Sequence, residues 1–112
     1  MMKITNEKIS ELLIIHTEGR LDAITSVEFE KEVMPMIQQS EHPVLIDFGK
    51  LEYISSAGLR TVLILAKETK KSNNSLALCS LNETILEVFR ISGFDTIVSI
   101  YPTIEEWFAS MK

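Results

Sequence analysis

The sequence predicts an α/β fold, a single domain with a mixed, mostly parallel β-sheet and α-helices packed on it. Strand-like and helix-like patterns alternate from Leu12 to the C-terminus, which is typical of crossover units around such a sheet. Residues 43–49 (PVLIDFG) form a nearly continuous apolar run, as in a central strand covered on both faces. The 112 residues, 46% hydrophobic and 24% charged, suffice for one core, so we expect one domain over residues 1–112.

The first half of the chain places a helix between two strands. Residues 12–19 (LLIIHTEG) are rich in β-branched side chains and end in glycine, which favours a strand before the run at 43–49. Residues 25–39 carry apolar side chains near helical spacing, namely Val27, Phe29, Val33, Met34 and Ile37. Thr25 followed by Glu28 forms a capping-box pattern, and Pro35 predicts that this helix kinks or ends nearby.

The second half continues the alternation. Residues 59–72 (LRTVLILAKETKKS) predict a helix whose last turns carry lysines that complement the helix dipole. Its apolar or core-facing positions are Leu59, Val62, Leu63, Ala66 and Thr69. A strand follows at 75–80, a short helix at 82–93 stopped by Gly93, and a strand at 96–101. Pro102 and Thr103 open a final helix at 103–112.

Charge and composition exclude several classes of function. The net charge of −5 argues against nucleic acid or an anionic membrane as the main partner and fits a basic protein partner better. Cys79 is the only cysteine, so no disulfide can form within the chain, and His16 and His42 lie far apart without cysteine companions. We therefore expect no metal and no cofactor. The N-terminus has no signal-like apolar core and no run reaches membrane-spanning length, so a cytoplasmic location is the default expectation.

The segment YISSAGLRTVL, beginning at Tyr53, raises the question of function. It contains no G-x-S-x-G, and the chain has no phosphate-binding G-x-x-x-x-G-K-[ST] or G-x-G-x-x-G motif, so we expect no catalytic residue and no enzyme. A serine before a helix is usually an N-cap, worth about 1 kcal/mol. Two consecutive serines exceed that need, and Gly58 suggests room for another chain to approach. A phosphate on such a serine is stabilised by the helix N-terminus, so it can switch an interface without unfolding the protein.

Three stretches resemble one family. LIDFGKLEYISSAGLRTVL (45–63) resembles the signature of STAS domains, especially bacterial anti-sigma factor antagonists, in which a buried strand precedes D-S-[STA]-G-L-[GR] at a helix start. GRLDAITSVEFE (19–30) is similar to the family's G-x-[LI]-D segment. Residues 76–107 follow its strand-helix-strand-helix ending. The resemblance covers nearly the whole chain and implies the STAS fold.

The resemblance also implies site residues. It makes Ser56 the phosphoacceptor, with Ser55, in the position where the family often has aspartate, as the minor alternative. It places Asp22 beside the switch loop, although a turn residue before the following helix explains Asp22 equally well. Arg60 is most simply a solvent-facing helix residue, and less so a partner contact. The partner surface implied in this way comprises Asp22, Ser55, Ser56, Ala57, Gly58 and Arg60.

The implied function is a phosphorylation switch. The unphosphorylated protein would bind an anti-sigma factor that is itself a serine kinase, an ATPase of the histidine-kinase-like fold, and so free a sigma factor for transcription. Phosphorylation of Ser56 would release that partner, and a serine phosphatase would reset the switch. The alternative is a regulatory or structural STAS subunit of a lipid-transport, chemosensory or stressosome-like assembly.

Overall fold

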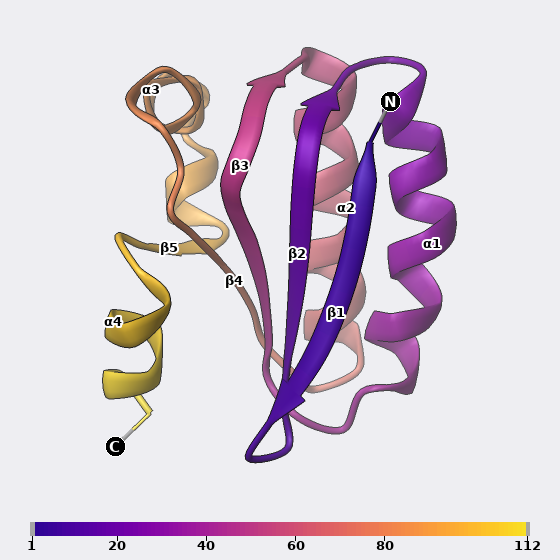
Figure 1. Ribbon diagram of the computed structural model, residues 1–112, viewed down its shortest axis with the longest axis vertical. Helices are drawn as coiled ribbons and strands as arrows, with labels where there is room; N and C mark the ends of the chain where they lie inside the picture. The colour runs from indigo at the N-terminus through magenta and orange to yellow at the C-terminus, as the bar shows by residue number, and fades with distance from the viewer. Residues whose placement is uncertain (1, 112) are drawn as a thin grey trace.

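A computed structural model describes residues 2–111 (Figure 1). In chain order the elements are β1 (Lys3–Ile9), β2 (Leu12–Leu21), α1 (Thr25–Gln39), β3 (Val44–Ile54), α2 (Ser56–Lys71), β4 (Leu76–Cys79), α3 (Glu83–Ser92), the 3-10 turn η1 (Phe94–Thr96), β5 (Ser99–Tyr101) and α4 (Ile104–Ala109). The sheet has the strand order β1-β2-β3-β4-β5. β1 runs antiparallel to β2 and the other pairs are parallel, which confirms the mixed, mostly parallel sheet with the 43–49 run at its centre.

The edge strand β1 was not predicted from the sequence. Its residues, KITNEKI, are mostly polar, and all but Ile4 are exposed, so they show no clean alternation of apolar and polar side chains. Ser10 and Glu11 join β1 to β2 in a tight turn with positive φ angles of 50° and 71°. The hairpin therefore depends on pairing with β2 rather than on burial of its own side chains.

Several element boundaries differ from the prediction. β2 and β3 are longer than expected and run to Leu21 and Ile54, so the whole KLEYI segment belongs to a strand. The strand predicted from 96 begins at Ser99, after η1, and the last helix ends at Ala109. α1 does not end at Pro35 but continues to Gln39, because this proline is exposed and the carbonyl that it leaves unbonded can face water.

Helices cover both faces of the sheet, and Figure 1 shows α1 and α2 side by side, with α1 to the right of β1 and α4 on the other side of the sheet. On the face that α1 and α2 cover, the main core joins strand residues such as Ile15 and Ile46 to Phe29 of α1 and Leu65 of α2. On the opposite face Trp107 of α4 packs in a smaller cluster with Ile14, Leu45, Ala77 and Cys79. The middle of the sheet is thus buried on both sides, as the continuous apolar run predicts.

The helix α1 does not bury all of its predicted apolar face. Phe29, Val33 and Ile37 are fully buried, but Val27 is 68% exposed. Val27, which the helical spacing grouped with these apolar residues, therefore does not lie in the core. No helix within residues 2–111 is long and apolar enough to cross a membrane.

Candidate functional site

The candidate site forms where two parallel strands end at the same edge of the sheet. Leu21, the last residue of β2, pairs with Ile54, the last residue of β3. Beyond these ends, the backbone N–H of Ser55 donates to the Leu21 carbonyl at 2.9 Å. This bond holds the loop after β2, which contains Asp22, against the start of α2.

The two serines have different structural roles. Ser55 is half-buried and caps α2, because its Oγ accepts a hydrogen bond from the backbone N–H of Gly58 at 3.2 Å. Ser56 is the first residue of the helix and is exposed. Its hydroxyl makes no hydrogen bond to another residue in the described range 2–111. Capping therefore explains the presence of a serine at position 55, whereas no stabilising contact with another described residue explains the serine at position 56.

Gly58 serves internal packing. It is buried, and a Cβ added to it would lie 2.7 Å from the Leu21 carbonyl oxygen and 2.9 Å from Ile54 Cγ1. The expectation that Gly58 makes room for another chain is therefore corrected: the close approach is between α2 and the end of β2. Ala57 is half-buried and Arg60 is exposed beside Ser56 on the outer surface of α2.

Asp22 caps the other helix. Its Oδ1 accepts hydrogen bonds from the backbone N–H groups of Ile24 at 3.0 Å and Thr25 at 2.9 Å. The Thr25 hydroxyl accepts one in return from the Asp22 N–H at 2.9 Å. This reciprocal pair is a capping box centred on Asp22 and Thr25, three residues before the predicted pair of Thr25 and Glu28, which is not the observed cap.

The capping bonds also favour the charged form of Asp22. The backbone hydrogen bond from Thr25 is the main reason that the pKa of Asp22 is lowered, with further contributions from the Ile24 N–H, the Thr25 hydroxyl and the charge of Arg20. The carboxylate is ionised at neutral pH in any case, and the lowered pKa extends its negative charge to more acidic pH. The interpretation of Asp22 as a turn residue before a capped helix thus has a definite structural basis, and a contact with a partner stays a prediction.

Four further exposed residues near the ends of β2 and β3 and the start of α1 were not singled out for function from the sequence. Ile24 is 77% exposed in the loop after Asp22, and Val27 follows it on the first turn of α1. Across the site, the Arg20 guanidinium lies 4.4 Å from the ring centroid of Tyr53, a cation–π contact that joins the ends of β2 and β3. A sequence signal could have identified Ile24. It is an apolar residue in the short loop between the capping Asp22 and the helix, where it has no core to pack against.

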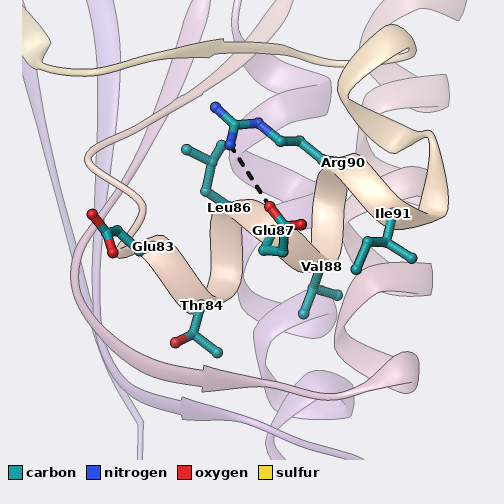
Figure 2. A pocket seen from close by; sticks show the side chains of 7 residues that line it. All are labelled: Glu83, Thr84, Leu86, Glu87, Val88, Arg90 and Ile91. Carbon is teal, nitrogen blue, oxygen red and sulfur yellow. Dashed lines mark ion pairs between the residues drawn. The ribbon is translucent and has the colours of Figure 1, made fainter.

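The hollow over α3 lacks the convergence of side chains from several elements that is expected of a site. Its volume is about 650 Å³, and Figure 2 shows that every residue labelled around it comes from that one helix. Arg90 there forms an exposed ion pair with Glu87 at 3.7 Å. Within residues 2–111, no group of three or more His, Cys, Asp or Glu side chains is arranged to hold a metal ion.

The fold and the site together define a class: a small α/β domain that presents a solvent-facing serine at a helix start, flanked by exposed apolar side chains. Residues 3–107 match the model of the STAS domain, and the chain belongs to that family. The resemblance seen in the sequence is thereby confirmed.

Relatives and solved structures agree with this assignment. BtrV of Bordetella bronchiseptica, whose name assigns it provisionally to the anti-sigma factor antagonists, is 41% identical over 90% of this chain and 84% of its own. The crystal structure of a Thermotoga maritima protein, also provisionally named an anti-sigma factor antagonist, superposes with a TM-score of 0.89 at 23% identity, covering 96% of this chain and 92% of that one. The phosphorylated form of SpoIIAA from Bacillus superposes with a TM-score of 0.73 at 21% identity, covering 98% and 100%.

Proposed function

We propose that this protein is an anti-sigma factor antagonist that binds an anti-sigma factor through the surface around Ser56 and is released when Ser56 is phosphorylated. The name and high coverage of BtrV support the partner class. The observation that carries the choice of Ser56 is the division between the two serines: Ser55 accepts the capping hydrogen bond, and Ser56 is exposed beside it.

The surroundings of Ser56 suit a protein interface. Ile24 and Val27 expose apolar surface after the end of β2. A hollow of about 460 Å³ continues along α1 and is lined by Val27, Glu30, Lys31, Met34 and Pro35. Burying such side chains against a partner contributes about 25 cal/mol for each Å² removed from water. The exposed Arg20 and Arg60 add donors for a partner's carboxylates.

A phosphate on Ser56 would change this surface without disturbing the fold. It adds about −1.5 to −2 charges at the helix N-terminus, where backbone N–H groups and the helix dipole stabilise an anion. The same charge resists the desolvation that an apolar interface requires, so the complex is weakened while the domain stays folded. SpoIIAA, which has the same fold, is a protein whose phosphorylated form has been solved.

The partners that complete this proposal are a serine kinase and a phosphatase. The anti-sigma factor would itself be the kinase, an ATPase of the histidine-kinase-like fold, and a serine phosphatase would restore the binding form. In this scheme the antagonist is the substrate of both enzymes.

The test uses a kinase-like anti-sigma factor from the source organism that binds the unphosphorylated protein, incubated with it and ATP. Mass spectrometry should place one phosphate on Ser56 in the wild type and in Ser55→Ala, and none in Ser56→Ala. In a pull-down, Ser56→Ala should stay bound to the anti-sigma factor in the presence of ATP, whereas Ser56→Asp should fold and bind weakly. Ser110→Ala, a serine on the distant C-terminal segment, is the matched control. Phosphate on Ser55, or release of Ser56→Ala by ATP, would refute the assignment.

A further inference from the structure

A row of polar side chains crosses four strands on the sheet face opposite α1 and α2. It consists of Glu7 on β1, His16 on β2, Asp47 on β3 and Cys79 on β4. His16 and Asp47 are direct register partners, as are Asp47 and Cys79. The register partner of His16 on β1 is Thr5, and Glu7 lies two residues further along β1, diagonally across from His16. Nothing in the proposed switch at Ser56 uses this row.

Both ring nitrogens of His16 face carboxylates. Nδ1 lies 2.7 Å from Asp47 Oδ2, and Nε2 lies 3.1 Å from Glu7 Oε1. An ionised carboxylate only accepts hydrogen bonds, and a neutral imidazole has a single N–H to donate. Both bonds therefore exist together only when the ring is protonated. Loss of that proton breaks one of them.

The two ends of the row are held very differently. Asp47 is fixed, because its Oδ1 also accepts the Gly49 N–H at 2.8 Å and lies 3.9 Å from the thiol of Cys79. The buried Cys79 has its pKa raised to about 11, mainly by desolvation, so it stays a neutral donor toward Asp47. Glu7 is 49% exposed on the edge strand, whose side chains are almost all exposed. The bond to Glu7 is the one that deprotonation releases.

We infer that His16 acts as a proton-controlled clamp that fastens the edge strand β1 to the central strands when the ring is charged. The ring sits in a polar hollow of about 210 Å³, and the remaining groups that line it are Lys3, Thr5, Thr17, Glu18 and Lys50. Lys3 and Lys50 oppose the positive ring and Glu18 favours it, so the two carboxylates bonded to the ring decide the outcome.

The direction of the pH response follows from the ring's surroundings. Burial lowers the pKa of His16, but the hydrogen bonds and charges of Glu7 and Asp47 outweigh it and raise that pKa above its usual value of 6.5. A raised histidine pKa means that the clamp is complete below pH 6.5 and is lost as pH rises through the folded-state pKa.

The test compares the wild type with Glu7→Gln, and uses Glu18→Gln as the control that removes an equal charge from the same hollow without touching the ring. NMR gives the pKa of His16, and amide hydrogen exchange between about pH 5.5 and about pH 8.5 gives the protection of β1, corrected for intrinsic exchange. In the wild type, β1 protection should fall as pH rises, more than that of β3.

Glu7→Gln should lower the pKa of His16 and remove the pH dependence of β1 protection, whereas Glu18→Gln should retain it. Each pH unit by which Glu7→Gln lowers the His16 pKa should correspond to about a tenfold change in the hydrogen-exchange protection of β1. Both measurements report the free energy of the interaction between Glu7 and the protonated His16 ring. A His16 that titrates at or below 6.5, or β1 protection that does not vary with pH, would overturn the clamp. His16→Gln provides a second check, because its β1 protection should be independent of pH.

Discussion

The unequal roles of Ser55 and Ser56 predict unequal costs when each is replaced by alanine. Ser55→Ala removes the oxygen that accepts the Gly58 N–H and leaves one N–H of the first helical turn without a side-chain partner. N-cap replacements by alanine cost about 0.5–2 kcal/mol. The observed bond of 3.2 Å lies at the long end of the usual range, so we expect about 1 kcal/mol.

Ser56→Ala should cost far less. The Ser56 side chain is exposed, it forms no hydrogen bond to a described residue, and alanine is a good helix former. Surface substitutions of this kind change stability by less than about 0.5 kcal/mol.

Thermal and urea unfolding followed by circular dichroism measure both effects. For a chain of this size, 1 kcal/mol corresponds to about 4 °C in Tm, so Ser55→Ala should melt about 4 °C below the wild type and Ser56→Ala close to it. Ser55→Asp is the rescue variant, because aspartate caps as well as serine and suits the helix dipole. Equal losses for the two alanine variants, or no loss for Ser55→Ala, would refute the division of roles.

Three further predictions concern Gly58, Asp22 and Cys79. Gly58→Ala should lower the free energy of unfolding by about 1–3 kcal/mol, because the clash with the Leu21 carbonyl exceeds the gain of about 1 kcal/mol in helix propensity. Urea unfolding measures this change, and an unchanged or raised urea midpoint would contradict the close approach of α2 to Leu21. The lowered pKa of Asp22 contributes stability that is present above pH 3.8 and is lost as pH falls further. As the pH is lowered, Tm should therefore fall less steeply for Asp22→Asn than for the wild type. Identical slopes of Tm against pH would contradict this contribution of Asp22. The buried thiol of Cys79, whose pKa is raised to about 11, should resist a thiol reagent at about pH 8 in the native protein and react at once in denaturant; rapid native labelling would show that it is accessible.

The elements with a periodic apolar pattern were predicted from the sequence, but the polar edge strand β1 was not. The apolar run of β3 and the amphipathic pattern of α2 record burial directly, because their core-facing positions must be apolar. β1 leaves no such record, since its backbone pairs with β2 while its side chains remain in water. Thr25 and Glu28 satisfied a local capping pattern, but β2 extends to Leu21 and leaves Asp22 to cap α1 instead.

The motif indicated where the candidate site lies, but the structural roles of its residues could not be predicted from the sequence. Similarity to the STAS signature pointed to Ser56, yet which serine caps α2 depends on where the helix starts, and a one-residue uncertainty in that boundary exchanges the two roles. Gly58 was expected to face a partner because sequence spacing alone does not show that Leu21 lies against it. Ile24 was not identified, and Val27 was grouped with the apolar residues of α1, because exposure depends on how α1 is oriented over the sheet.

The hydrogen bond between Ser55 N–H and the Leu21 carbonyl bears on how such proteins diversify. It joins main chain to main chain, so no side chain at either position is required for it. Mutations at Ala23, Ile24, Val27 or Arg60 can therefore accumulate and alter the surface around the start of α2, while Ser56 keeps its place. Under the proposed function, duplicated copies of such a domain can thus acquire separate partners by changes of surface side chains alone, with the Ser56 hydroxyl inherited unchanged.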